Sequence, residues 1–352
     1  MHNDLRFAGW RVERVGPIGS DWVRKLWLPK VRELLTSSEP SQLFRKSPDH
    51  CERLRRALIS LEGLAIGDAL GEMLSYRHRQ APRIIAEGLP AGPWFRTDDS
   101  EMGISIVEVL QLYGYIHQAA LSRRFAWRFE REPERGYGRG TRVQLAEILR
   151  GEDWQKLAAD AFGGRGSLGN GGAMRVAPLG AFFSNDLERA AAGAELSARV
   201  THTHPEAVAG TIAVAIAAAA ASQPAPAPAR LFETVLQFTP GSKVRDAIQR
   251  ASTIPPTADL EAVAHSLGNG SQVTAQDTVP FTIWSAAHHL HNFVSALAQT
   301  IQVGGDCDTN SAIVCGIVVC ATGLDGIPAG WRTSKEPLPA VIATSSSTPP
   351  LE

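Results

Sequence analysis

The amino-acid sequence predicts an all-α fold, and three observations support this prediction. Apolar residues recur at helical spacing, as in Leu54, Leu58, Leu61, Ala65 and Ala69. No stretch shows the sustained apolar–polar alternation or the hairpin signals that are typical of β-sheets. The 22 prolines and 32 glycines fall mainly between the helical segments, where long loops offer places to build a site.

Length and composition are those of an ordinary globular chain. It has 352 residues, of which 44% are hydrophobic and 20% are charged, and a net charge of −1. This balance does not indicate nucleic-acid or membrane partners. Four cysteines without zinc-site spacing favour a reducing compartment. The first residues lack an apolar signal segment, and the longest apolar run, residues 212–221, is too short to span a bilayer. We expect a cytoplasmic monomer.

We expect three regions along the chain. Residues 1–50 are an N-terminal extension of unknown role, ending in a serine-containing linker at residues 37–47. Residues 51–325 are the main domain, and residues 326–352 are a flexible C-terminal tail. The first helix of the domain carries Gly63, Gly67 and Gly71 on one face. Such a stripe permits close helix packing or the approach of a ligand to the backbone.

Further helices follow in order along the domain. A helix over residues 99–115 begins behind an acidic run. Eight arginines in residues 121–150 alternate with four glutamates and with aromatic residues, which favours a solvated helix face over a nucleic-acid surface. The other helices are expected at residues 184–200, 207–221, 243–300 and 310–322, with breaks at Pro255-Pro256, at residues 268–270 and at Pro280.

Two short acidic runs carry the strongest chemical signal. They are Thr97-Asp98-Asp99-Ser100 and Asp306-Cys307-Asp308-Thr309. Carboxylate and hydroxyl oxygens suit Mg²⁺ or Mn²⁺, and a cation would relieve the repulsion between four carboxylates in one pocket. Each run also precedes an apolar helix, so helix capping is an equal alternative. The two roles are compatible, because a cap leaves outer oxygens available.

Two other segments could contact a ligand. The glycine-rich segment at residues 163–172 could cradle a phosphate, but it matches neither a Walker A loop nor a Rossmann fingerprint. A plain flexible loop fits it as well. Thr201-His202-Thr203-His204 precedes Pro205 and a helix, and its histidine spacing gives poor support for zinc. These histidines fit either a polar ligand contact or a buried hydrogen-bonded role.

Seven motifs occur in the same order as in the ADP-ribosylglycohydrolases, and the chain resembles this family from about residue 57 to residue 323. The segments at residues 135–138, 162–175 and 267–270 look most like the branch that contains the ADP-ribosylserine hydrolase. The seven motifs are Gly67-Asp68-Ala69-Leu70-Gly71, Thr97-Asp98-Asp99, Arg135-Gly136-Tyr137-Gly138, Gly169-Asn170-Gly171-Gly172-Ala173-Met174-Arg175, Thr201-His202, Val279-Pro280 and Gly304-Gly305-Asp306-Cys307-Asp308-Thr309.

The resemblance implies an orthogonal multi-helix bundle that hydrolyses the N- or O-glycosidic bond at the anomeric carbon of ADP-ribose. Its partners would be ADP-ribosylated proteins or small-molecule conjugates. It also implies two divalent cations, Mg²⁺ or Mn²⁺, and Asp98 or Asp99 would accept the proton of the attacking water. The implied cation ligands are Thr97, Asp98, Asp99, Asp306, Asp308 and Thr309.

The resemblance further implies which residues contact the substrate. Asp68 would be an inward-facing acid that supports the site. Phe162 would stack against the adenosine part, and His202 would touch the phosphate or the distal ribose. The diphosphate would lie on Gly166, Ser167, Gly169, Asn170 and Gly171.

The chain departs from the family pattern near the leaving group. Ser75 stands where the family usually carries a glutamate, and Glu72 is displaced from that position by about one helical turn. Leu168 replaces a tyrosine of the most similar branch. These departures leave serine, arginine, nucleic acid and acetyl-ADP-ribose open as leaving groups. They also leave open a catalytically impaired module that binds ADP-ribose, and a metal-dependent phosphohydrolase that would yield AMP.

Overall fold

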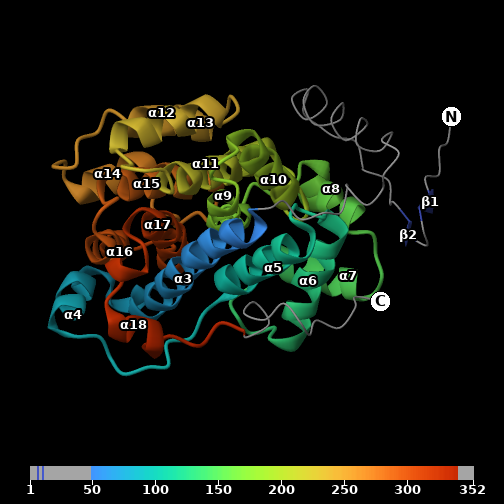
Figure 1. Cartoon of the computed structure of the whole chain (residues 1–352), viewed down its shortest axis with the longest axis horizontal. Coiled ribbons are helices and arrows are strands. Elements are labelled where there is room, and N and C mark those ends of the chain that lie inside the picture. Colours follow the sequence, from blue (N-terminus) through green and yellow to red (C-terminus); the bar gives the residue numbers. More distant parts are fainter. Residues whose placement is uncertain (1–5, 8–9, 12–48, 340–352) are drawn as a thin grey trace. The chain divides into compact units, whose positions relative to one another are not determined.

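The computed structural model describes residues 6–7, 10–11 and 49–339. The chain divides into two units, Met1–Arg45 and Lys46–Glu352. In the first unit, β1 (Arg6–Phe7) and β2 (Trp10–Arg11) form a short antiparallel pair that the sequence did not predict. The predicted linker at residues 37–47 lies outside the described residues. The named elements of the second unit are all helices (Figure 1), so the predicted all-α class is confirmed.

The second unit contains long helices joined by short ones. Within the described part of the chain, no helix is both long enough and apolar enough to cross a membrane. The helices are α3 (His50–Leu74), η1 (Ser75–Gln80), α4 (Ala81–Glu87), α5 (Asp98–Tyr113), α6 (Gln118–Arg131), α7 (Arg139–Leu149), α8 (Trp154–Gly164), η2 (Asn170–Gly172), α9 (Ala177–Phe182), α10 (Leu187–Arg199), α11 (Pro205–Ala221), α12 (Pro228–Phe238), α13 (Lys243–Ala251), α14 (Leu260–Leu267), α15 (Ala275–His288), α16 (Phe293–Gln302), α17 (Cys307–Thr322), η3 (Leu324–Gly326) and α18 (Ala329–Ser334).

The glycine stripe of α3 packs directly on the backbone of α17. A methyl group at Gly63 would lie 2.5 Å from the carbonyl oxygen of Cys315, and one at Gly71 would lie 2.7 Å from the Cα atom of Asp308. At Gly67 it would overlap the carbonyl group of Ser311. The two helices are therefore antiparallel and in backbone contact, which confirms the close-packing interpretation of the stripe. This contact brings the C-terminal part of α3 beside the start of α17.

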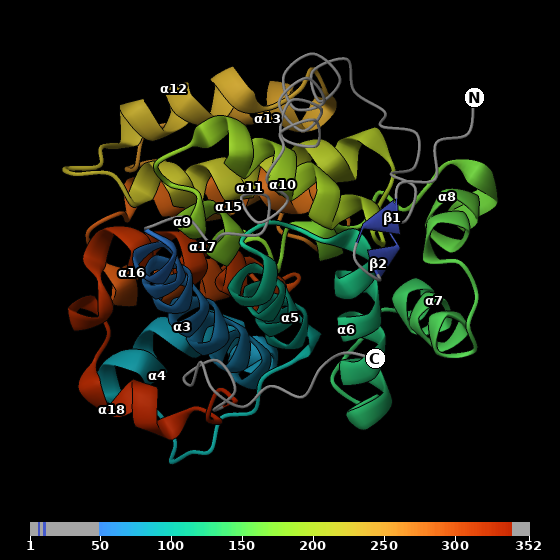
Figure 2. The ribbon, with the colours of Figure 1, turned by 45° about the vertical axis from the view of Figure 1, so that its right-hand side comes forward.

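The other helices surround this pair. Helix α5 lies beside α3 (Figure 2), and Gly103 of α5 faces Leu61 and Leu64 of α3. Helix α11 contacts α9 through Gly180 and α15 through Gly210. It is buried along nearly its whole length, which explains its uniformly apolar sequence. Helices α12 and α13 form an outer layer over α11 and α15 (Figures 1 and 2).

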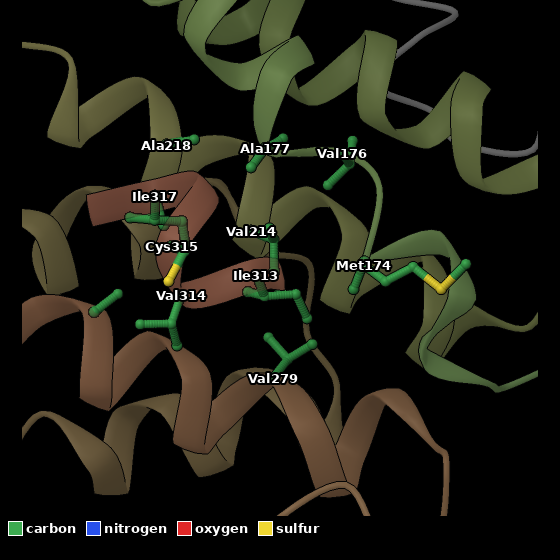
Figure 3. Close-up of a cluster of buried hydrophobic side chains, with 14 of the residues drawn as sticks. Met174, Val176, Ala177, Val214, Ala218, Val279, Ile313, Val314, Cys315 and Ile317 are labelled. Atoms are coloured by element: carbon green, nitrogen blue, oxygen red, sulfur yellow. The ribbon is translucent and has the colours of Figure 1, made fainter. Parts of the chain in front are cut away.

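One hydrophobic cluster joins α11, α15 and α17 to the segment that enters α9 (Figure 3). Ile313 and Val314 of α17 lie with Val214 of α11 and Val279 of α15, and all four are essentially inaccessible to solvent. Burying such a side chain contributes roughly 1.5–3 kcal/mol. Cys315 belongs to the same cluster and is a fully buried core residue.

The expected break at Pro280 is wrong, because Pro280 lies inside α15. Proline removes one backbone donor and crowds the preceding turn, at a cost of about 3 kcal/mol. Its neighbours Val279, Phe281 and Ile283 are fully buried, and their burial offsets that cost.

The predicted flexible tail needs correction over residues 326–339. Helix α18 places Trp331 edge-on against Trp94, with ring centroids 6.4 Å apart. The Glu336 amide donates to the Trp94 carbonyl at 2.8 Å, and its carboxylate accepts two hydrogen bonds of 2.7 Å from Arg135. The proline and serine content of this segment suggested a flexible tail, because composition does not indicate long-range contacts. Residues 340–352 lie outside the described residues.

Replacing Gly67 by alanine should destabilise the protein by about 3 kcal/mol, because overpacking a rigid backbone contact costs roughly 1–3 kcal/mol or more. Gly330→Ala in α18 is the matched control, since no atom lies within 4 Å of an added methyl group there. Alanine at that helical position should be neutral or slightly stabilising. Urea denaturation measures both changes, and equal stability of the two variants would contradict the packing account.

Deleting residues 326–352 should lower the free energy of unfolding by at least about 2 kcal/mol, because each hydrogen bond to a charged group contributes about 1.5–3 kcal/mol. Deleting only residues 340–352 keeps the Arg135–Glu336 pair and is the control. Thermal denaturation of both truncated chains is the measurement. Indistinguishable curves would show that the segment at residues 326–339 does not stabilise the domain.

Candidate functional site

The first acidic run opens α5, where Thr97 is both a helix cap and a link to α3. Its hydroxyl oxygen accepts a hydrogen bond from the Asp99 amide at 3.3 Å. The same hydroxyl donates to Asp68 Oδ1 at 2.7 Å. Capping therefore uses the threonine hydroxyl and does not use the carboxylates of Asp98 and Asp99.

Asp68 lies on α3 and fixes the start of α5. It is fully buried. Its Oδ1 accepts hydrogen bonds from the Thr97 amide and hydroxyl, and its Oδ2 accepts from the amides of Thr97 and Ser100 and from the Ser100 hydroxyl. Because both oxygens are occupied, the arrangement favours the supporting role that was expected for Asp68.

The second acidic run opens α17 after a sharp turn. Gly304 and Gly305 have φ values of +70° and +77°, a region that favours glycine. The Asp306 amide donates to the Asn269 carbonyl at 3.2 Å. Asp306 is the N-cap residue of α17, but its side chain makes no capping hydrogen bond. Capping therefore does not account for the acidic side chains of this run.

The two runs meet beside Asp68. Carboxylate oxygens of Asp68, Asp99 and Asp308 lie within 4.8 Å of one another. Thr309 donates to Asp99 Oδ1 at 3.3 Å, which links α17 to α5. Asp99 Oδ2 is buried and has no hydrogen-bond partner among the described residues. A buried carboxylate oxygen without a partner is costly, so this atom is suited to a ligand that the protein does not itself supply.

The electrostatics of this cluster favour a cation. Burial, followed by the charges of Asp308 and Asp68, raises the pKa of Asp99 well above its usual range. Burial, together with the charge of Asp308, raises the pKa of Asp68 to about 7 despite the hydrogen bonds from Ser100 and Thr97. Without a counter-charge the cluster must therefore retain protons near neutral pH. Crowded carboxylate oxygens with a partnerless buried atom fit a hard divalent cation.

Asp98 and Asp306 lie at the edges of the cluster. The Asp98 amide donates to the Arg135 carbonyl at 2.7 Å, and a methyl group at Gly136 would lie 3.6 Å from Asp98 Oδ1. Asp306 Oδ2 accepts a hydrogen bond from Asn170 Nδ2 at 2.6 Å. Burial and the charge of Asp308 raise the pKa of Asp306 to about 7. Both predicted ligands thus lie close enough to the central carboxylates for the charge of Asp308 to raise their pKa values.

The glycine-rich loop is joined to the acidic cluster through Asn170. Besides Asp306, the Asn170 side chain donates to the Thr278 hydroxyl of α15 at 3.0 Å. The Asn170 amide donates to the Val273 carbonyl, and the Ala275 amide donates to the Leu168 carbonyl at 3.0 Å. These bonds hold the loop against α15, so residues 167–172 are not a plain flexible loop.

His202 packs against the backbone of this loop. A methyl group added at Gly171 would lie 2.9 Å from His202 Nε2, and one at Gly169 would lie 3.1 Å from the same atom. Burial, followed by the charge of Arg175, lowers the pKa of His202 to about 3. The imidazole is therefore neutral at physiological pH. The structure brings His202 to the glycine loop and not to the carboxylates, where a zinc ligand would lie.

Two bulky residues with left-handed backbone lie in the segments that form this loop. Phe162 and Val273 both have a φ of +54°, which costs about 1–3 kcal/mol for such side chains. Both are exposed, Phe162 by 62% and Val273 by 56%. Strained and exposed apolar side chains are common at ligand-binding positions, and Phe162 is available for the stacking that was expected of it.

Sequence reasoning missed two asparagines that support the second acidic run. Asn310 Nδ2 donates to the Asn269 carbonyl at 2.6 Å, and that carbonyl also accepts from the Asp306 amide. Asn310 Oδ1 is buried without a partner among the described residues. The available signal was the position of Asn310 one helical turn after Asp306, which places it on the same face of α17.

The position that was expected near the leaving group is Ser75, which carries no carboxylate. The Ser75 hydroxyl donates to the Glu72 carbonyl at 2.9 Å and so satisfies the end of α3. Glu72 lies one turn after Asp68, and burial and the charge of Asp308 raise its pKa. The Glu72 carboxyl group is therefore close enough to the cluster to be affected by the charge of Asp308, although the residue is exposed.

Comparison with known proteins assigns the chain to a family. The ADP-ribosylglycohydrolase family model matches residues 49–342. The chain belongs to the ADP-ribosylglycohydrolase family. The predicted class of enzyme, a hydrolase of the glycohydrolase type, is confirmed with it.

Relatives of this glycohydrolase come from several kingdoms. It is 31% identical to an uncharacterised protein of Archaeoglobus fulgidus over 80% of this chain and 90% of that protein. It is 27% identical to the ADP-ribosylhydrolase ARH3 of Homo sapiens, covering 69% of this chain and 75% of ARH3. It is 26% identical to the ADP-ribosyl-[dinitrogen reductase] glycohydrolase of Rhodospirillum rubrum, covering 78% and 88% of the two chains.

The fold of the glycohydrolase is also found among solved structures. A structure titled ADP-ribosylglycohydrolase-related protein complex superposes with a TM-score of 0.53 and 25% sequence identity. The match covers 81% of this chain and 94% of that chain. The helical bundle expected from the resemblance is thereby confirmed.

In the metal-stripped glycohydrolase the free energy of unfolding should fall as the pH rises from about 4 to about 7. The pKa values of Asp68 and Asp306 are raised to about 7 in the folded state. In this pH range the folded protein therefore retains protons that the unfolded chain has released. Each retained proton lowers stability by about 1.4 kcal/mol per pH unit. Urea titrations in EDTA across this range are the measurement.

Saturating Mn²⁺ should abolish this downward slope, since bound cations replace the retained protons. The variant Asp99→Asn, which weakens the cluster, is expected to respond less to Mn²⁺. A stability profile that stays flat in EDTA, or one that Mn²⁺ leaves unchanged, would contradict the electrostatic account of the cluster.

Proposed function

We propose that this glycohydrolase removes ADP-ribose from a modified protein or a small-molecule conjugate by hydrolysing the bond at the anomeric carbon. The leading observation is the buried, partnerless Asp99 Oδ2 within a carboxylate cluster. The hydrogen bond from Asn170 to Asp306 also supports the proposal, because it connects the glycine loop to the carboxylate cluster. One ligand could then contact both parts at once.

We infer that two cations, Mg²⁺ or Mn²⁺, bind between α5 and α17. When bound, they would orient the ribose hydroxyls and lower the pKa of the attacking water. Asp99 and Asp308 would contribute central oxygens, and Asp68 would hold the start of α5 in position. The remaining expected ligands, which surround these central oxygens, are Thr97, Asp98, Asp306 and Thr309.

Proton transfer in this proposal depends on carboxylates of raised basicity. Burial raises the pKa of Asp98 well above its usual range, and the charges of Asp68 and Asp308 add to this effect. Asp98 is less buried than Asp99 and has space beside it at Gly136. A raised pKa makes a carboxylate a stronger base. Asp98 is therefore well placed to accept the proton of the water, with Asp99 as its neighbour in the same role.

The glycine loop is the proposed site for the rest of the substrate. Gly166, Ser167, Gly169, Asn170 and Gly171 would bind the diphosphate, because glycine permits close approach to the backbone. The exposed ring of Phe162 would stack on the adenine. His202 would donate from the side of the loop.

A catalytically impaired ADP-ribose-binding protein is the second candidate, and Ser75 is the observation that favours it. No carboxylate stands at that position, and the hydroxyl is bonded to the backbone of Glu72. This candidate predicts binding of ADP-ribose without turnover of any conjugate. Calorimetry with ADP-ribose, run beside a panel of serine, arginine, nucleic-acid and acetyl conjugates with Mg²⁺, Mn²⁺ or EDTA, separates the two.

Asp306→Ala should lower the rate of ADP-ribose release by at least about 10³-fold, because losing a cation ligand removes several kcal/mol of transition-state stabilisation. Asp325→Ala, in the exposed η3 segment, is the matched control and should retain full activity. Chromatography of the products distinguishes ADP-ribose from AMP. Unchanged turnover in a folded Asp306→Ala variant would refute the assignment.

A further inference from the structure

Arg175 is a buried cation without an acidic partner. Its side chain is fully buried behind the glycine loop, and its guanidinium lies 4.5 Å from the ring centroid of Phe125. It forms no ion pair with an acid of the described residues. Its Nη2 donates instead to the Ser197 carbonyl at 3.0 Å and to the Thr201 hydroxyl at 2.8 Å. Burying an unpaired charge is expensive, so this residue requires a physical explanation.

The hydrogen bond from Arg175 determines how the Thr201 hydroxyl interacts with His202. Its hydroxyl oxygen accepts from Arg175, which has donors only. The hydroxyl proton then needs an acceptor, because Thr201 is only 2% exposed. The acceptor within reach is His202 Nδ1, at 2.7 Å. Nδ1 must therefore be unprotonated, which puts the proton of the neutral imidazole on Nε2.

The protonated Nε2 lies against Gly169 and Gly171 of the glycine loop. It is the atom that a methyl group at Gly171 or Gly169 would approach, at 2.9 Å and 3.1 Å. No hydrogen bond joins it to another atom in the described part of the chain. Glycine at both positions keeps this donor accessible from the loop.

We propose that Arg175 and Thr201 are positioning residues that hold His202 as the neutral Nε2–H tautomer, so that Nε2 donates to an anionic oxygen of the diphosphate. This inference rests on the proposed function, which places a diphosphate on the loop. In the opposite tautomer Nε2 would present a lone pair and repel the anion. The direction of the whole chain of hydrogen bonds is set by Arg175, because a guanidinium cannot act as an acceptor.

The tautomer can be measured without any ligand. Nitrogen-15 NMR of histidine-labelled protein distinguishes Nε2–H from Nδ1–H, and a His202→Gln variant identifies the signal. We expect His202 to be the Nε2–H form in the wild-type protein and in Thr201→Ser, which keeps the hydroxyl. An Nδ1–H signal for His202 in the wild-type protein would overturn the proposal.

Calorimetry with ADP-ribose tests the consequence for binding. Thr201→Val removes the hydroxyl at nearly constant volume and should weaken ADP-ribose binding about tenfold, whereas Thr201→Ser should restore it. Thr239→Val is the matched control, because that buried hydroxyl donates to the Val235 carbonyl at the end of α12. Equal affinity of wild-type and Thr201→Val protein would overturn the proposal. If the wild-type protein has the Nε2–H tautomer and binds ADP-ribose but releases no ADP-ribose from any conjugate, only the proposed function is contradicted.

Discussion

The contact between the glycine face of α3 and the backbone of α17 is the constraint on which the rest of the structure depends. Gly67 and Gly71 let the two helices approach until backbone touches backbone. Asp68, between these glycines, then lies beside the first turn of α17, where Asp308 is found. Larger residues on that face would separate the helices and pull the two carboxylates apart. The packing of the core and the chemistry of the site therefore have a common cause.

The site shows how one segment can serve stability and function together. Thr97 caps α5 with its hydroxyl oxygen and anchors Asp68 with its hydroxyl proton. The acidic side chains that follow are left to repel one another in a buried space, which is unfavourable until a cation or protons are bound. The proposed cation site therefore has a cost in stability when no cation is bound. The buried Arg175, which forms no ion pair among the described residues, extends this pattern to the glycine loop.

Local signals in the sequence predicted more than distant ones. Helical spacing identified α3, and the acidic runs identified the starts of α5 and α17, because periodicity and capping act within a few residues. The sequence did not indicate that Asn269 accepts a hydrogen bond from Asp306, that Arg175 donates to Thr201, or that Glu336 pairs with Arg135. Each of these contacts joins residues that are remote in the chain. The predicted helix break at Pro280 was wrong because tertiary burial outweighed the local preference of proline.

The central claim is that the packing of α3 on α17 builds a cation site from Asp99 and Asp308. Anomalous diffraction from crystals soaked in Mn²⁺ tests this claim most directly, since it locates the metal without reference to activity. The account predicts anomalous peaks between the carboxylates at the starts of α5 and α17, with Asp68 supporting from behind. Crystals that bind Mn²⁺ elsewhere, or that show no peak at this cluster under saturating conditions, would contradict it.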